Sequence, residues 1–220
     1  YATNSVGTAY GNEVTFTTLE NEPLPSVTIG TQIWSSRNLD VTTYRDGTPI
    51  PQVTDPTQWA NLTTGAWCYY NNDPANGSTY GKLYNWYAVA GIHDTDPSTP
   101  NKVLAPQGWH VPSDTELLTL TSSILGGQSV AGGKMKSTGI TLWLSPNRAA
   151  TNESGFTGHP GGLRYSDGSF DYINGNGYWW SSSESNTLLA WLTQLYYDIG
   201  NASRGRGDKG NGFSVRCIRD

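Results

Sequence analysis

The sequence is poor in the residues on which many catalytic centres and all membrane-spanning helices depend. Its 220 residues include only two cysteines, three histidines and one methionine, and no run of eighteen apolar residues occurs. Because a transmembrane helix needs about 18 or more such residues, we expect no direct membrane insertion. Charged residues make up only 14%, with 13 basic against 18 acidic. Nucleic-acid binders are globally basic, so this balance argues against nucleic-acid partners.

The scarce cysteines and histidines form no local metal motif. Cys68 and Cys217 are far apart, and neither belongs to a CxxC pair. A single long-range disulfide in an extracellular protein and two buried thiols in a cytosolic one are both open. The histidines lack the i, i+4 or HxH spacing of a zinc site, and we expect His110 to be a packed or hydrogen-bonded ring.

Calcium is the one metal for which ligand types are present. Oxygen-bearing side chains cluster at 71–73, 94–96 and 152–153, and calcium is bound by such oxygens. None of these clusters matches an EF-hand loop, and Asx turns explain each of them without metal. We therefore expect no cofactor and keep calcium as the alternative.

What the chain has in abundance favours β-structure with long turns. Gly, Asn, Ser and Thr are frequent, and there are nine Trp and thirteen Tyr. Such a mix suits strands and turns more than helical bundles. Aromatic side chains at a surface commonly mark binding sites for sugars or protein partners, whereas the alternative is that most of them pack the core.

The pattern of the first 26 residues predicts the end of one domain and a linker. Residues 1–18 alternate apolar and polar positions around a Gly-containing turn, and they resemble the C-terminal strands of a fibronectin type III-like sandwich. Residues 19–26 contain two prolines and two glutamates and read as a linker. The chain starts in mid-pattern without a signal peptide, so we expect it to be part of a larger multidomain or fibre protein, with 27–220 as a second domain.

Two helices are expected within the second domain. Over 81–90 the apolar residues recur at the i, i+3, i+4, i+7 spacing of a buried face. Over 114–125 the signals are stronger, because Ser113 and Glu116 form a capping box and Gly126 with Gly127 ends the pattern. Two helices among many short strands indicate an α+β fold.

The last forty-four residues, 177–220, look like a rigid sheet that carries one exposed surface. Aromatic and apolar residues lie at both ends, whereas 198–212 is rich in Gly, Asn and charge. We expect this middle part to be an irregular surface loop, since loops tolerate such content. Arg206-Gly207-Asp208 spells an integrin-recognised tripeptide, a match too short to carry weight. Arg204 and Lys209 flank it as further polar contacts.

Several motifs carry a resemblance to a known family. TIGTQIWSSRNLD, CYYNNDPANGSTYGKLYNWYAV, LAPQGWHVPSDTE, GYWWSSS and GFSVRC occur in order between Val27 and Asp220. They resemble the Fibrobacter succinogenes major paralogous domain, found in secreted and surface proteins. That family is similar to the formylglycine-generating-enzyme branch of C-type lectin-like folds, with helices, short antiparallel sheets and long irregular loops. The resemblance implies that the strand at 27–33 lies beside 215–218 and that the protein is extracellular, on a bacterial cell surface.

The same branch includes the variable proteins of diversity-generating retroelements, which bind ligands through a C-terminal face. The resemblance therefore implies a non-catalytic, adhesin-like module that binds a host or bacterial surface protein or glycan. The expected ligand-binding residues are Tyr178, Trp191, Tyr196, Tyr197, Asp198, Asn201, Arg204, Arg206, Asp208 and Asn211. An enzyme or degraded enzyme of the formylglycine-generating type is the alternative. Those enzymes use a cysteine pair before the final strand, and 178–212 contains no cysteine. A structural spacer is the second alternative.

Overall fold

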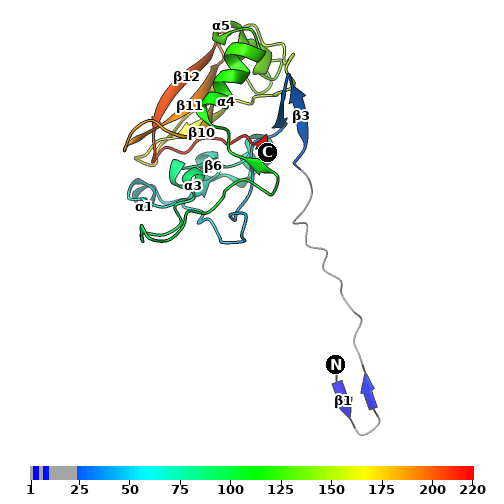
Figure 1. The fold of residues 1–220 in the computed structure, drawn as a ribbon, viewed down its shortest axis with the longest axis vertical. Helices are drawn as coiled ribbons and strands as arrows, with labels where there is room; N and C mark the ends of the chain where they lie inside the picture. The colour runs from blue at the N-terminus through cyan, green and yellow to red at the C-terminus, as the bar shows by residue number, and fades with distance from the viewer. Residues whose placement is uncertain (1, 5–6, 10–23) are drawn as a thin grey trace.

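The computed structural model describes residues 2–4, 7–9 and 24–220 (Figure 1). Two short strands, β1 (Ala2–Asn4) and β2 (Gly7–Ala9), pair in antiparallel fashion. This pairing agrees with the hairpin expected at the start of the chain. Residues 10–18 of the expected sandwich strands and most of the expected linker lie outside the described residues.

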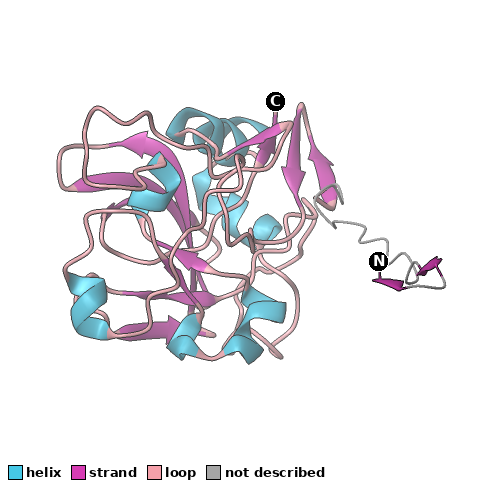
Figure 2. Cartoon of the chain, turned by 90° about the horizontal axis from the view of Figure 1, so that it is seen from below, coloured by secondary structure: helices cyan, strands magenta, loops and turns pink. Residues whose placement is uncertain are grey.

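Residues 24–220 form a mixed α+β structure with small antiparallel sheets, as the sequence predicts. Helices and long loops surround the strands (Figure 2). The helices are α1 (Pro56–Ala60), α2 (Gly77–Tyr80), α3 (Trp86–Ala90), α4 (Asp114–Leu118), continued by a π-helical turn at Thr119–Ile124, and α5 (Gln128–Met135). Single 3-10 turns lie at Tyr70–Asn72 and Pro74–Asn76. None of the helices within the described ranges is long and apolar enough to cross a membrane.

The four-stranded sheet brings the two ends of the domain together. Its order is β3 (Ser26–Ile29), β4 (Gln32–Ser35), β13 (Ile218–Arg219) and β7 (Trp109–His110). Ile218 pairs with Trp34, and the Ser35 amide donates to the Cys217 carbonyl at 2.8 Å. The last strand β13 therefore pairs with β4, the second strand of the domain, so the expected contact of 27–33 with 215–218 is present in the same sheet but one strand further along than predicted.

The three-stranded sheet has the longest strands in the domain and contains most of the C-terminal segment. It consists of β10 (Asn176–Glu184), β11 (Leu189–Tyr196) and β12 (Ala202–Asp208), in that order. Two strand pairs complete the set: β5 (Trp67–Cys68) with β6 (Leu83–Tyr84), and β8 (Gly161–Arg164) with β9 (Phe170–Ile173). The loop expected over 198–212 is therefore wrong for 202–208, which is an edge strand.

The hydrophobic core consists mainly of two clusters, one on each face of β10. Trp179 packs with Trp34, Phe156 and the buried residues of α4 and α5, whereas Trp180 packs with Tyr84 and Phe213 on the opposite side. Neighbouring residues of a strand point to opposite faces, so the Trp-Trp pair serves both halves. Each indole also donates a hydrogen bond, Trp179 to Asn38 Oδ1 and Trp180 to the Tyr84 carbonyl, both at 2.9 Å.

The expected helix over 114–125 is confirmed, together with its cap. The Ser113 hydroxyl accepts from the Glu116 amide at 3.3 Å, and the Glu116 carboxylate accepts from the Ser113 amide at 2.7 Å. The helix expected over 81–90 is wrong in its first half. Residues 83–84 pair with 67–68 as a strand, and the helix begins at Trp86 after the Asn85 cap.

The helix α5 is one that the sequence pattern did not predict. It contains Gly132 and Gly133, which lower helix propensity, and it has no clear amphipathic stripe. Both glycines are buried. Only glycine fits at these positions, because a Cβ atom at Gly132 would collide with the Asn201 carbonyl and one at Gly133 with the Ala149 carbonyl. The tertiary contact therefore stabilises a helix that local preference disfavours.

Both cysteines are free and buried, in different parts of the core. Cys68 lies with Trp59 and Tyr70, whereas Cys217 lies with Trp109 and Val215. Of the two alternatives that the sequence leaves open, the structure therefore has the two buried thiols and no Cys68–Cys217 disulfide. Burial raises the pKa of each thiol to about 12.

Candidate functional site

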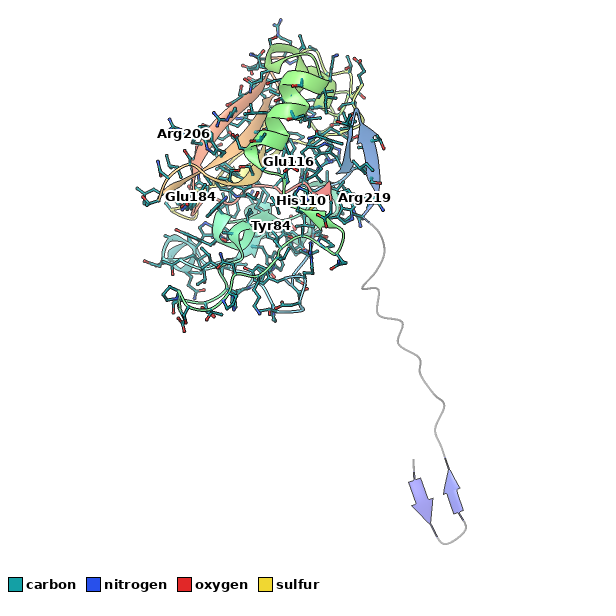
Figure 3. All side chains as sticks on the ribbon, viewed as in Figure 1. Tyr84, His110, Glu116, Glu184, Arg206 and Arg219 are labelled. Atoms are coloured by element: carbon teal, nitrogen blue, oxygen red, sulfur yellow. The ribbon has the colours of Figure 1, made fainter. Side chains whose placement is uncertain are left out.

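The exposed end of the three-stranded sheet carries a cluster of aromatic and charged side chains. The strand register pairs Trp191 with Arg206, Thr193 with Arg204 and Leu189 with Asp208. Cross-strand partners project to the same face of a sheet. Trp191, Arg204, Arg206 and Asp208 therefore share one face, which we call the Arg–Trp patch; Figure 3 labels Arg206 at this outer edge of the domain.

A bidentate ion pair fixes the geometry of this patch. Arg204 donates through Nε and Nη2 to the two carboxylate oxygens of Asp114, at 2.8 and 2.7 Å. Its guanidinium carbon lies 3.2 Å from the centroid of the Trp191 ring. Asp114 is the first residue of α4, and its amide donates to the Ser183 hydroxyl at 3.0 Å. The helix terminus thus holds Arg204, and Arg204 holds the indole.

Arg206 is arranged differently from Arg204. Its guanidinium carbon lies 5.5 Å from the centroid of the same Trp191 ring, and the side chain is exposed. Among residues 24–220 no carboxylate forms an ion pair with it. Its donors are therefore available to a partner, beside an aromatic ring that is already positioned.

Asp208 adds a negative charge at the end of the same strand. One of its carboxylate oxygens accepts from the Gly210 amide at 2.8 Å, and the side chain is exposed. Lys209, which the sequence also suggested as a polar contact, is instead buried. Its ammonium is paired with Glu184 and lies 4.7 Å from the centroid of the Trp86 ring. Lys209 is therefore part of the core and does not belong to the patch.

The glycines of β12 explain how a charged strand can lie on the core. Gly205 and Gly207 alternate with the exposed arginines and face inward. A Cβ atom at Gly207 would lie 2.6 Å from Phe213 Cε2 and 2.9 Å from Leu192 Cδ2. The segment RGRGD is thus a strand whose charged side chains point to solvent and whose glycines pack against the core. The tripeptide Arg206-Gly207-Asp208 is therefore explained by the packing of this strand.

Two of the expected tyrosines lie on the opposite face of the sheet. Tyr178 pairs with Gln194 in the register and is buried, with its ring stacked on Phe213 at 5.2 Å between centroids. Tyr196 is half-buried, and its hydroxyl donates to Gln194 Oε1. These two tyrosines therefore cannot contact the ligand that contacts Arg206. Tyr178 as an accessible aromatic anchor is a wrong prediction, because its ring is part of the core.

The remaining expected residues are spread along the sheet. Tyr197 is half-buried against the α5 side of the core, whereas Asp198 and Asn201 are exposed in the turn between β11 and β12. Asn211 lies beyond the other end of β12, and its side-chain oxygen accepts from the Ser166 amide at 2.8 Å. A seven-residue strand spans roughly 20 Å or more, so these residues do not form one compact pocket.

Sequence reasoning missed Asp114, the residue that anchors the patch. Its place at the start of α4 could be read from the capping box, but its contact with Arg204 joins positions 90 apart in the sequence. No local signal marks such a pair. Only the packing of α4 against β10 and β11 reveals it.

The three oxygen-rich clusters considered for calcium form turns. Asp73 accepts from the Ala75 amide at 2.9 Å, Asp94 from the Asp96 amide at 3.0 Å, and Asn152 from the Thr157 amide at 2.8 Å. The bonds of Asp73 and Asp94 are the Asx-type turns expected from the sequence, whereas that of Asn152 closes a longer loop between residues five positions apart. Within the described part of the chain, no three His, Cys, Asp or Glu side chains lie together as a metal site.

Comparison with known proteins places the chain in a family. The model of the Fibrobacter succinogenes major domain matches residues 27–219. Neither the comparison with curated proteins nor the comparison with solved structures found a match.

Proposed function

This chain belongs to the Fibrobacter succinogenes major domain family, and on that premise we propose that it is a non-catalytic ligand-binding module that contacts its partner through the Arg–Trp patch. The observation that carries this proposal is the exposed Arg206, which lies over Trp191 with no ion-pair partner among residues 24–220. Arginine and tryptophan are the residue types most enriched at sites that dominate binding energy.

The patch is suited to binding because its parts are already fixed. The Arg204–Asp114 pair holds the indole, so little side-chain freedom is lost when a partner covers it. Arg206 can form two parallel hydrogen bonds with a carboxylate, sulfate or phosphate group. The partner is a protein or glycan that presents an anionic group beside an apolar or ring surface.

The wider setting of the proposal follows from the family resemblance. We propose a C-type lectin-like fold, which the pairing of β4 with β13 near the two ends of the domain supports. The module belongs to a larger adhesin-like protein on a bacterial cell surface or fibre, behind a fibronectin type III-like domain. In the diversified form of this proposal, the exposed positions of β11 and β12 are the ones that vary.

The enzyme alternative meets a chemical obstacle. The thiolate is the reactive form of cysteine, and burial raises the pKa of both Cys68 and Cys217 to about 12. The spacer alternative has no comparable obstacle. It differs from the binding proposal only in requiring no ligand.

A glycan and cell-binding assay tests the proposal. The full chain, fluorescently labelled, is applied to immobilised sialylated, sulfated and neutral glycans and to epithelial cells, beside the variants Arg206→Ser and Arg148→Ser. Arg148 is an exposed arginine outside the patch, so its variant controls for loss of one positive charge. Binding that is lost in Arg206→Ser and kept in Arg148→Ser supports the patch. Absence of binding to every surface favours the spacer, and turnover of a Cys-containing sulfatase peptide would favour the enzyme.

A further inference from the structure

A second concave surface lies on the side of the domain where the chain enters and ends. It is a groove of about 1100 Å³ bordered by Leu24, by the segment 37–47, by the turn 77–81 and by residues 104–109, with Arg219 at its edge. Figure 3 places Arg219 beside the β3–β4 hairpin and Arg206 on the far side of the domain. The groove is therefore separate from the Arg–Trp patch. Its volume is at the upper end of typical ligand sites.

The charged side chains around the groove differ in how they are bound within residues 24–220. Asp40 is paired with Lys82, and Asp46 is paired with Lys102 at 2.6 Å. Arg45 donates from Nε and Nη2 to the carbonyls of residues 105, 106 and 109, which hold its guanidinium against that segment. Arg37 and Arg219 are exposed, and within residues 24–220 neither forms an ion pair. The groove thus carries two exposed guanidinium groups without an ion-pair partner in the described part of the chain, although the net charge of the protein is -5.

The rest of the lining is a mixture of uncharged polar and apolar groups. Thr43, Ser78 and Gln107 contribute hydroxyl and amide groups, and Leu24 and Val41 contribute partly exposed apolar surface. Hydroxyl and amide groups can form hydrogen bonds with the hydroxyls of sugar rings, and apolar side chains can contact the C–H faces of those rings. The arginines add the means to bind carboxylate or sulfate groups on those rings.

An extended peptide fits this groove less well. Peptides that bind by strand addition need an exposed sheet edge several residues long. The strand that borders the groove, β7, has two residues, Trp109–His110, and Pro106 and Gly108 precede it. The edge therefore offers too few backbone groups for a peptide strand.

From this combination we infer that the groove beside β7 and β13 binds an acidic oligosaccharide, with Arg37 and Arg219 contacting carboxylate or sulfate groups at two points along the sugar chain. This second site is independent of the patch used in the proposed function. Leu24, at the start of the domain, lines the groove and packs against the hydrophobic core of the domain. A bound sugar would therefore lie against the point where the domain joins its upstream neighbour.

Affinity electrophoresis of the full chain tests this inference. The gels contain polygalacturonate, dextran sulfate, neutral dextran or poly-L-glutamate. The proteins are the wild type, Arg37→Gln/Arg219→Gln, and Lys134→Gln/Arg148→Gln as the charge-matched control, whose two positions lie outside both the groove and the Arg–Trp patch. We expect retardation by polygalacturonate or dextran sulfate, and not by neutral dextran. The groove variant should bind roughly tenfold more weakly or worse, while the control keeps its retardation. Which polysaccharide retards the chain identifies carboxylate or sulfate as the recognised group.

Three results would overturn the inference. The first is no retardation by either acidic polysaccharide. The second is equal weakening in the groove variant and in the control, which would indicate general charge attraction. The third is equal retardation by poly-L-glutamate, which would indicate an acidic peptide or any polyanion. Arg206 is unchanged in both variants, and Arg206→Ser reports on the Arg–Trp patch in its own binding assay, so the two proposals fail independently.

Discussion

Replacement of Gly207 by alanine tests whether β12 lies on the core through its glycine backbone. A Cβ atom there would meet Phe213 Cε2 at 2.6 Å, Leu192 Cδ2 at 2.9 Å and Trp180 Cη2 at 3.0 Å. All three belong to buried core side chains. The backbone at this glycine is an ordinary extended strand, so alanine adds a methyl group and no backbone strain.

The expected cost follows from two opposing effects. Overpacking a core by a methyl group destabilises by about 1 to 3 kcal/mol, whereas replacing glycine by alanine in a compatible conformation stabilises by about 0.4 to 1 kcal/mol through the unfolded chain. We expect a net loss of about 1 to 2 kcal/mol. For a domain of this size, that lowers Tm by roughly 2 to 8 °C.

Thermal unfolding followed by circular dichroism measures this shift, with Gly161→Ala as a matched control. Gly161 is also buried in a strand, but its nearest heavy atoms would lie 3.5 Å from the new Cβ, an ordinary contact distance. The control should keep or raise Tm. An unchanged Tm in Gly207→Ala, or equal losses in both variants, would refute the account of β12.

Two further predictions concern titrating groups. The His110 ring lies between the carboxylates of Glu116 and Asp220, each at 2.8 Å. Burial opposes protonation of His110, but the hydrogen bonds to both carboxylates outweigh it and raise the His110 pKa. Burial likewise opposes ionisation of Glu116, but the hydrogen bonds from Ser113 and His110 outweigh it and lower the Glu116 pKa. The stabilisation from His110 is present below about pH 6.5 and is lost as pH rises through its raised pKa, whereas that from Glu116 is lost as pH falls below about 4.5. In urea unfolding, His110→Gln should therefore lower the free energy of unfolding most between these two pH values. A loss that stays constant from pH 5 to about 9 would contradict the ion pairs. For the cysteines, iodoacetamide at about pH 8 should label neither Cys68 nor Cys217 in the native protein and both in denaturant, as read by mass spectrometry; a disulfide-linked peptide would show the buried-thiol assignment to be wrong.

Features determined by short-range chemistry could be predicted from the sequence. The capping box at Ser113 and Glu116 needs only residues three positions apart, and the observed helix begins where it predicts. The Asx turns at Asp73 and Asp94 are equally local. Recognition of the family rested on several motifs in order and extends over 27–219.

Other features depend on which distant segments approach one another. The apolar spacing over 81–90 suits a helix, but the pairing of Leu83 and Tyr84 with β5 makes the first part a strand. The glycines of α5 disfavour a helix locally, yet the close approach of the β11–β12 turn and of Ala149 requires them. In each case a long-range contact outweighed a local preference of about 1 kcal/mol.

The same distinction applies to the candidate site. Composition alone shows that the C-terminal segment combines arginines, aromatics and glycines. The strand register places Arg204 and Arg206 on one face with Trp191, and Tyr178 and Tyr196 on the other. The docking of α4 brings Asp114 to the first of these arginines. Register and docking fix the direction of each side chain, and no local pattern predicts them because both depend on contacts between residues far apart in the chain.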